Sequence, residues 1–205
     1  MRPNARNADT RWMSETDPAA LEAALRETPR SRHLPPAQQG YAGQDQALPI
    51  GLGQTNSQPR TVRAMLSALD VRPGQQVLDV GSGSGWTTVL LARLVGPAGH
   101  VLGVERVPEL TAWGRANVEA ADVPWATVEQ ARPDVLGHPA YAPFDRILVS
   151  AGAVALPQEL VDQLAPDGVM VIPVGGELWR VRPGRHPERL GRYAFVPLLG
   201  PSAQV

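Results

Sequence analysis

Residues 76–105 read QVLDVGSGSGWTTVLLARLVGPAGHVLGVE, and this stretch decides the fold. An apolar run, 76–80, leads into a glycine turn and then into a segment with helical spacing, 86–95. A Gly-Pro turn at 96–99 precedes a second apolar run that ends on Glu105. The order strand, turn, helix, turn, strand predicts one parallel βαβ unit of roughly thirty residues.

The glycine turn predicts a ligand site. Gly81, Gly83 and Gly85 let the backbone approach a ligand closely and start the next helix with free N–H groups. Glu105 ends the following strand, where a carboxylate can accept from both hydroxyls of a ribose. The spacing is G-x-G-x-G, whereas a dinucleotide site has G-x-G-x-x-G. With Asp79 two residues ahead, the pattern resembles the S-adenosylmethionine site of class I methyltransferases. An ordinary α/β turn with incidental glycines is the alternative.

Composition narrows the class of protein. The chain has 205 residues, of which 43% are hydrophobic and 19% charged, with a formal net charge of −1 and no cysteine. We expect one compact, cytoplasmic globular domain without disulfides, and neither nucleic acid nor membrane as a partner. The four histidines show no paired metal spacing, so no metal site is predicted. The oligomeric state is not predicted.

The chain before the βαβ unit divides in two. Residues 1–47 are expected to form an N-terminal arm with a short helix that begins at Asp17, and residues 48–205 the main domain. Residues 28–47 are interrupted by prolines and read as an extended arm or cover. Residues 48–59 read as a loop, with Ser57 placed to cap a helix that follows. That helix has an apolar stripe made of Val62, Met65, Leu66 and Leu69.

Further strands and helices alternate after Glu105. Helices are expected over 108–121 and 158–164, strands over 125–129, 144–150 and 169–174, and a closing hairpin that pairs 178–182 with 192–198. The fold class is therefore α/β: a doubly wound, mostly parallel, Rossmann-like sheet with a C-terminal antiparallel hairpin. Ligands of such sheets bind at the carboxyl ends of the strands, where 81–85, Glu105 and 150–152 are expected to meet.

Four segments resemble the protein-L-isoaspartate (D-aspartate) O-methyltransferase family. Residues 48–59, LPIGLGQTNSQP, are similar to its P-I-G-x-G-Q-T-I-S-Q-P loop, which general methyltransferases lack. Residues 77–85 are similar to its cofactor loop, and 104–110, VERVPEL, to its V-E-R-x-P-E-L segment. Parts of 144–198 resemble its second half. The resemblance covers about residues 40 to 200.

The resemblance implies methyl transfer from S-adenosylmethionine to the free carboxylate of isoaspartyl residues in peptides and proteins, followed by succinimide formation and repair. A carboxylic acid is already ionised at neutral pH, so no general base is required. The enzyme mainly has to align the reacting atoms in a dry site. By this resemblance the cofactor-binding residues are Asp79, Gly81, Ser82, Gly83, Gly85, Glu105 and Arg106. Gln54, Thr55 and Ser57 bind the substrate, and Ser57, with Thr55 nearby, acts in catalysis by orienting the carboxylate.

Simpler roles remain open for several of these residues. Ser57 can be a helix cap only, Thr55 can be structural, Asp79 can hold the glycine turn through backbone N–H groups, and Glu105 can be a solvated strand end. The family's G-D-G acid near the adenine has no clear counterpart, because Arg132-Pro133-Asp134 stand there.

Two other positions depart from the family pattern. Asn56 replaces an aliphatic residue and Arg60 an apolar or aromatic one. A dedicated aspartyl methyltransferase of one biosynthetic peptide is therefore an alternative. The missing adenine-side acid leaves a non-catalytic remnant of the fold as another. Under every catalytic interpretation, the turn at 81–85 and Glu105 must lie beside residues 54–59.

Overall fold

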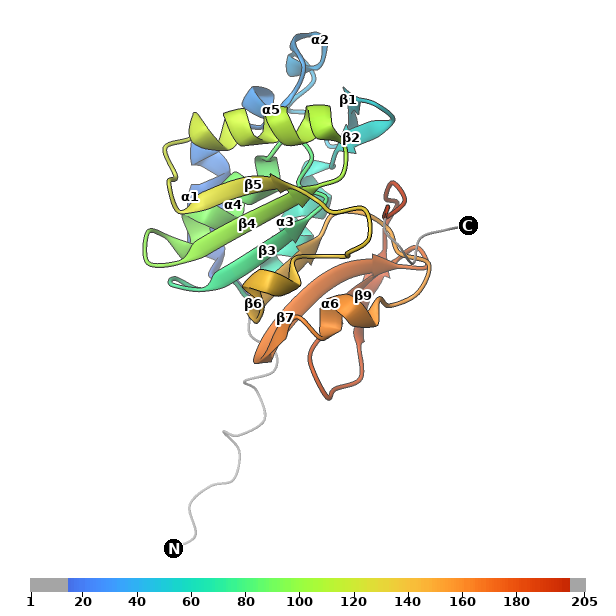
Figure 1. Ribbon diagram of the computed structural model, residues 1–205. Helices are drawn as coiled ribbons and strands as arrows, with labels where there is room; N and C mark the ends of the chain where they lie inside the picture. The colour runs from blue at the N-terminus through green and yellow to red at the C-terminus, as the bar shows by residue number, and fades with distance from the viewer. Residues whose placement is uncertain (1–14, 200–205) are drawn as a thin grey trace, which may run out of the picture.

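A twisted seven-stranded sheet forms the centre of residues 15–199, the part of the chain that the computed structural model describes (Figure 1). Its strand order is β5-β4-β3-β6-β7-β8-β9. The strands are β3 Gln76–Val80, β4 His100–Glu105, β5 Ala126–Gln130, β6 Phe144–Val149, β7 Leu164–Val174, β8 Glu177–Val181 and β9 Glu188–Arg192. Neighbours from β5 to β7 are parallel, and β8 and β9 are antiparallel.

The predicted βαβ unit is confirmed. Strand β3 leads through the glycine turn into α4 (Trp86–Val95), and β4 pairs with β3 in parallel. Neighbouring residues of β3, such as Val77 and Leu78, are both fully buried although they point to opposite faces. Burial on both faces explains why this strand reads as a continuous apolar run.

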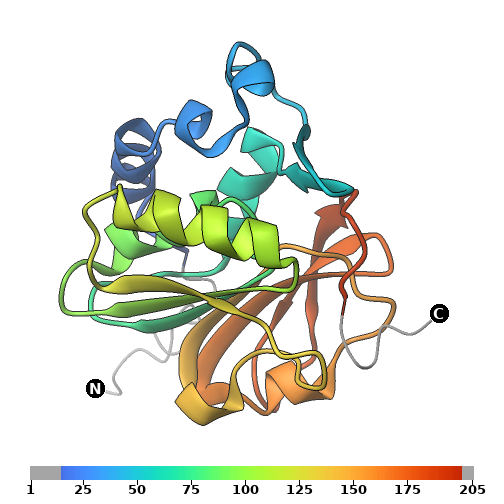
Figure 2. The same cartoon turned by 45° about the horizontal axis from the view of Figure 1, so that its top comes forward.

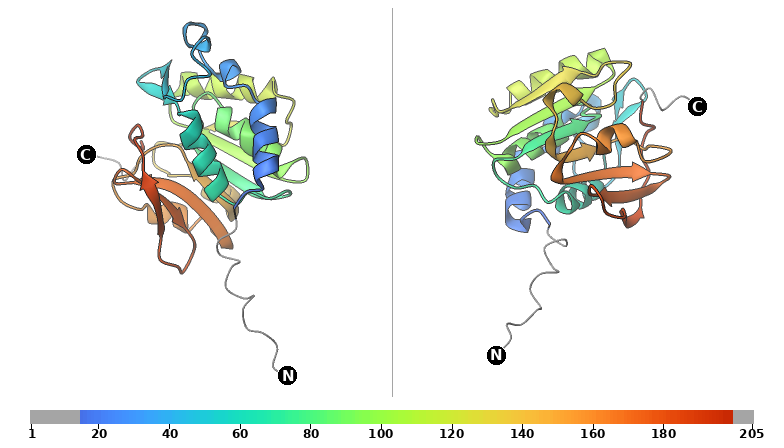
Figure 3. Two further views of the ribbon diagram at one scale, coloured as in Figure 1. Left: turned by 180° about the vertical axis from the view of Figure 1, so that it is seen from behind. Right: turned by 60° about the horizontal axis from the view of Figure 1, so that its bottom comes forward.

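Helices cover the two faces of the sheet unequally. On one face lie α1 (Pro18–Glu27), α3 (Pro59–Ala68), α4 and α5 (Pro108–Glu119), with α1 and α3 side by side at the back (Figure 3). The other face carries the short helix α6 (Gln158–Val161) and the connection that contains η3 (Pro139–Tyr141). The doubly wound fold is therefore confirmed, and the predicted stripe of α3 is buried in the core of the first face.

The N-terminal segment is ordered differently from the prediction. Helix α1 begins as predicted, since Asp17 accepts from the N–H of Ala19 at 2.9 Å. Residues 28–47 do not form an extended arm, because η2 (Arg30–His33) and α2 (Pro36–Gln39) fold there. The cause is Arg30, which is only 5% exposed. Its guanidinium donates to the carbonyls of Ala42, Gln44 and Gln46, so the chain curls around it.

Residues 48–59 form a hairpin rather than the predicted loop. Strands β1 (Leu48–Gly51) and β2 (Gln54–Asn56) pair antiparallel, and the turn between them has positive φ from Gly51 to Gly53. The prediction that Ser57 caps α3 is wrong, because Gln58 occupies the cap position and its side chain makes no capping bond. Instead the carboxylate of Asp45 accepts from the N–H of Arg60, in the first turn of α3, at 2.9 Å.

The C-terminal hairpin is confirmed in kind but not in its bounds. Its second strand is β9, not 192–198, and α6 ends at Val161 because β7 already begins at Leu164. The chain after β9 leaves the sheet and crosses its carboxyl edge, where Gly152 donates to Val196 at 2.7 Å and Leu198 donates to Gly152 at 2.8 Å. This segment therefore lies next to the β1–β2 hairpin (Figure 2).

Between residues 15 and 199, no helix combines the length and apolar character needed to cross a bilayer. The same residues contain no group of three or more His, Cys, Asp and Glu placed to hold a metal ion.

Candidate active site

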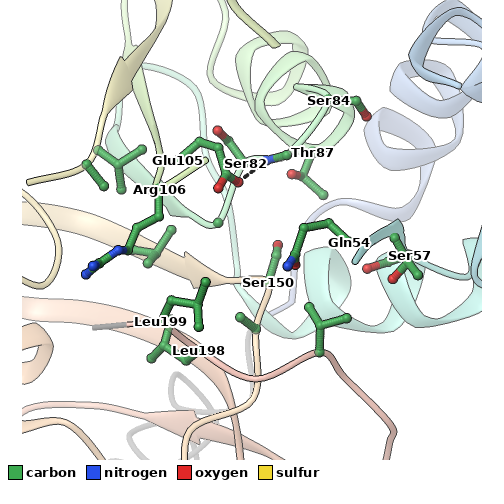
Figure 4. Close-up of a pocket in the computed structure, with 18 of the residues that line it drawn as sticks. Gln54, Ser57, Ser82, Ser84, Thr87, Glu105, Arg106, Ser150, Leu198 and Leu199 are labelled. Atoms are coloured by element: carbon green, nitrogen blue, oxygen red, sulfur yellow. Dashed lines mark hydrogen bonds between the residues drawn. The ribbon is translucent and has the colours of Figure 1, made fainter. Parts of the chain in front are cut away.

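One cavity at the carboxyl edge of the sheet joins the segments singled out in the sequence (Figure 4). Gly81 to Ser84 and Glu105 line it together with residues 54–57, so the predicted juxtaposition is confirmed. The rest of the lining comes from β1, β3, the start of α4, β4 with Arg106 after it, the 131–137 connection, the two residues after β6 and the C-terminal segment 196–199.

The glycine turn takes a conformation that favours glycine at each predicted position. Gly81, Gly83 and Gly85 have φ of +78°, +53° and +80°. The turn is tied to the neighbouring strand, because Gly81 and Ser82 both donate to the carbonyl of Val104. Gly85 is not part of the cavity lining; its role is to begin α4 in a left-handed conformation.

Glu105 is a buried, fixed carboxylate rather than a solvated strand end. It is 7% exposed, with one oxygen accepting from the N–H of Gly83 and the other from the N–H of Val107, both at 2.9 Å. Each oxygen keeps a further lone pair, so the carboxylate can still accept from a ligand in the cavity.

Asp79 lies behind the glycine turn and does not line the cavity. It is fully buried, and one of its oxygens accepts from the hydroxyls of Thr87 and Thr88 at 2.7 Å each. Burial, with a smaller effect of the nearby Glu105 charge, raises the pKa of Asp79 to about 6 although the threonine hydroxyls oppose the change. It therefore secures the first turn of α4 rather than the backbone N–H groups considered from the sequence.

Two buried hydroxyls on the cavity lining lack a partner among residues 15–199. The Oγ atoms of Ser82 and Ser150 are buried and make no hydrogen bond to any residue from 15 to 199. Buried polar atoms are normally satisfied, so these two call for a polar ligand or ordered water. With the Glu105 carboxylate and a glycine turn that opens onto the cavity, they fit a nucleoside that carries hydroxyls and amines.

The hairpin supplies the opposite side of the cavity. Gln54, Thr55 and Ser57 all line it, as predicted. Figure 4 shows Ser150 between Glu105 on one side and Gln54 and Ser57 on the other in that view. Within residues 15–199 the Ser57 hydroxyl makes no hydrogen bond, and it is not needed as a helix cap. It is therefore available to a ligand.

A second cavity opens directly beside the first. The two share Thr55, Ser57, Ser150 and Val196. The rest of its lining is Ala47, Gln58, Arg60, Thr61, Arg192, Tyr193, Ala194 and Phe195. A ligand in the first cavity and a second ligand in this groove would therefore meet at the hydroxyls of the hairpin.

Residues 131–137 form one wall of the first cavity, but Asp134 lies outside it. Ala131, Val135, Leu136 and Gly137 line the first cavity, whereas Asp134 does not. The Asp134 carboxylate instead pairs with Arg132 at 3.2 Å. Arg106 does line the cavity, and its guanidinium donates to the carbonyl of Pro133 at 3.1 Å.

Several lining residues were not predicted as site residues. Ser150 was expected at this edge, because it directly follows the strand that pairs with β3, but it was given no role in the site. Asn56 and Ser84 are joined across the cavity wall by a 3.2 Å hydrogen bond that no local pattern indicates. Residues 196–198 were expected in a strand and Leu199 was given no role, so the place of this segment on the cavity was missed.

The sequence is similar to those of known proteins. The family model for protein-L-isoaspartate(D-aspartate) O-methyltransferase (PCMT) matches residues 13–186. The protein-L-isoaspartate O-methyltransferase of Aeropyrum pernix is 44% identical over 193 residues, which cover 90% of this chain and 74% of that one. The enzyme of the same name from Methanopyrus kandleri is 43% identical over 185 residues, or 86% of this chain and 82% of that one.

A solved structure extends the agreement to three dimensions. A Plasmodium falciparum protein assigned to the same methyltransferases was crystallised in complex with S-adenosyl-L-homocysteine. It superposes with a TM-score of 0.78 at 25% identity and covers 89% of this chain and 91% of its own. This chain belongs to the protein-L-isoaspartate(D-aspartate) O-methyltransferase family.

Proposed function

We propose that this enzyme methylates the free α-carboxylate of isoaspartyl residues in peptides and proteins, with S-adenosyl-L-methionine as the donor. The methyl ester then closes to a succinimide without the enzyme, and hydrolysis returns part of it to normal aspartate. The observation that carries the proposal is the shared wall of the two cavities, at Thr55, Ser57 and Ser150. Donor and acceptor must meet at one point, and this wall provides it.

The first cavity is the proposed cofactor site. The Glu105 carboxylate, the Ser82 hydroxyl, the glycine turn and the Arg106 side chain would hold the cofactor, and Asp79 would support the turn from behind. When bound, S-adenosyl-L-methionine supplies a methyl group on a positively charged sulfur.

The hydroxyls of the hairpin would orient the substrate. We assign Ser57 to donate a hydrogen bond to the substrate carboxylate, with Thr55 and Ser150 beside it on the shared wall. Holding a carboxylate at a fixed distance and angle contributes to the rate by itself, because the reaction needs alignment rather than proton transfer.

No base is needed for this chemistry, and the lining supplies none. Glu105 is the one acid among the described residues that line the first cavity, and both of its oxygens already accept from backbone N–H groups. Apolar side chains, among them Ile50, Leu136 and Leu198, make up much of the remaining wall. They would exclude water and so strengthen the attraction between an anionic acceptor and a cationic donor.

A paired peptide assay tests the proposal. An isoaspartyl peptide and its normal aspartyl twin are incubated with the enzyme and labelled S-adenosyl-L-methionine. We expect base-labile methyl incorporation into the isoaspartyl peptide alone. Methylation of neither peptide, with S-adenosylhomocysteine binding retained in calorimetry, would point to a dedicated substrate instead. Absence of binding as well would mean that the chain is a non-catalytic remnant.

A further inference from the structure

The second cavity, which we call the substrate groove, carries positive charge on its lining. Arg60 and Arg192 are the charged residues among the described residues that line it, and no acid lines it. The chain as a whole has a formal net charge of −1, so this concentration of arginines does not reflect a basic protein. The charge is local to the groove.

Arg192 carries the less balanced charge of the two arginines. It ends β9, is exposed, and makes no ion pair with any residue from 15 to 199. Its neighbour across the strands, Glu177, pairs instead with Arg189 at 3.4 Å. The Arg192 guanidinium is therefore available to a ligand.

Arg60 contributes a partly balanced charge. Its side chain is 77% exposed and lies 3.5 Å from the carboxylate of Asp45, which is outside the groove lining. An exposed pair of this kind is weak, so a substrate carboxylate can compete for the guanidinium.

The position of the groove determines which residues of a peptide substrate would lie near these arginines. It joins the cofactor cavity at Ser57 and Ser150, where the reacting carboxylate must lie. An extended peptide advances by about 3.3–3.6 Å for each residue, so the groove would receive the residues just beside the isoaspartate. Tyr193 and Phe195 provide apolar surface along the same path.

We propose that Arg192, assisted by Arg60, makes this enzyme favour isoaspartyl sites that have an acidic residue nearby in the sequence. The inference rests on the proposed function and adds a substrate preference to it. The acidic side chain would pair with a guanidinium that has no partner within the described chain. A nearby lysine would be repelled by the same charges.

The test is a set of isoaspartyl peptides that differ at one position. Glu, Gln or Lys is placed at each of the two positions before and after the isoaspartate, and kcat/KM and peptide binding to the S-adenosylhomocysteine complex are measured. At one or more positions we expect kcat/KM in the order Glu, Gln, Lys, with about a two- to fivefold difference per step at low salt. The difference should shrink in 0.5 M salt.

Variants identify the residues responsible. Arg192→Glu should reverse the order of Glu and Lys peptides, and Arg60→Gln should reduce the ratio. Arg185→Gln, an exposed arginine outside the groove, is the matched control and should leave the ratio unchanged.

Three outcomes would overturn the inference. If the Gln peptides are methylated but Glu gives no advantage at any position, or if Arg192→Glu leaves the ratio as it was, the preference is refuted and the proposed function stands. If no isoaspartyl peptide is methylated, the proposed function fails and this inference fails with it.

Discussion

Ser57 is the residue for which the structure best separates a structural from a functional role. A serine just before a helix usually acts as its cap, and losing such a cap costs about 1 kcal/mol. Here the N–H of Arg60 is bonded to Asp45 instead, while Ser57 faces both cavities. The simpler interpretation of Ser57 as a cap is therefore removed.

Ser57→Ala should lower kcat by at least about tenfold while the free energy of unfolding changes by less than about 0.5 kcal/mol. The reason is that the hydroxyl contacts the substrate and not the helix end. Methyl-transfer kinetics and urea unfolding of the same preparation check this. Thr127→Ala, which removes an exposed hydroxyl from β5 outside both cavities, is the control for turnover. Equal turnover of Ser57→Ala and the parent protein would refute the catalytic role.

Asp45→Ala should lower stability rather than kcat, the opposite of Ser57→Ala. Removing the carboxylate leaves the first turn of α3 without its acceptor, so the melting temperature should fall by a few degrees. If Ser57→Ala and not Asp45→Ala lowered the melting temperature, the capping assignment would be wrong.

Asp79 should make stability depend on pH in a characteristic direction. Its pKa is raised in the fold to about 6, from 3.8, mainly by burial. Between these values the folded state keeps a proton that the unfolded state has released, so stability is greatest below about pH 4 and falls as the pH rises towards 6. Asp79 alone would contribute a fall of about 3 kcal/mol.

Urea unfolding at pH 4, 5, 6 and 7 measures this effect in the parent protein and in Asp79→Asn. The variant lacks the titrating group, so the difference between the two curves isolates Asp79 from other acids. Parallel curves across this range would show that Asp79 ionises normally in the fold.

At the scale of elements, the sequence pattern correctly predicted those helices and strands that depend on contacts between residues close in sequence. The βαβ unit, the cap of α1 and the stripe of α3 follow from residues within one or two turns of one another, and each is confirmed. The turn-rich segments were harder, because their partners are distant in sequence. The 28–47 segment folds around one buried arginine whose acceptors lie up to 26 residues away.

The bounds of the C-terminal hairpin were also missed because they depend on contacts distant in sequence. Residues 188–192, which form β9, are polar and have a weak strand pattern, whereas 195–198 are apolar and read as a strand. The apolar residues are instead needed where the chain crosses the cavity and contacts Gly152. The site was predicted where it is built from the βαβ unit and missed where the C-terminal segment completes it.

Contact between two elements also sets the shape of the cofactor loop. Helix α5 passes so close to the glycine turn that a Cβ on Gly114 would lie 2.6 Å from the carbonyl oxygen of Gly83. Gly114→Ala should therefore push α5 from the loop, destabilise the fold by about 1–3 kcal/mol and weaken S-adenosylhomocysteine binding. Gly43→Ala is the control, since nothing lies within 4 Å of the added methyl group. Unchanged affinity and stability in Gly114→Ala would show that the loop yields freely.

At the scale of the whole molecule, three segments distant in sequence meet at Arg30. Its guanidinium donates to the Asn56 side chain at 2.8 Å and lies 5.5 Å from the ring of Trp86 at the start of α4. Asn56 in turn donates to Ser84 on the cofactor cavity. The asparagine that departs from the family pattern thus joins the N-terminal segment and the hairpin to the cofactor loop.

We therefore expect Arg30→Met to destabilise the fold by about 2–4 kcal/mol, because two buried and three partly buried acceptors lose their donor at once. Amide hydrogen exchange should accelerate over residues 42–56, and S-adenosylhomocysteine affinity should fall, since the hairpin and the loop lose a common anchor. Arg32→Met, in the same turn but exposed, is the control. A cycle with Asn56→Leu tests the connection directly: the two substitutions should cost less together than the sum of their separate costs, because each removes the same bond. Strictly additive costs would show that Arg30 holds the N-terminal segment alone and that the cofactor loop is positioned without it.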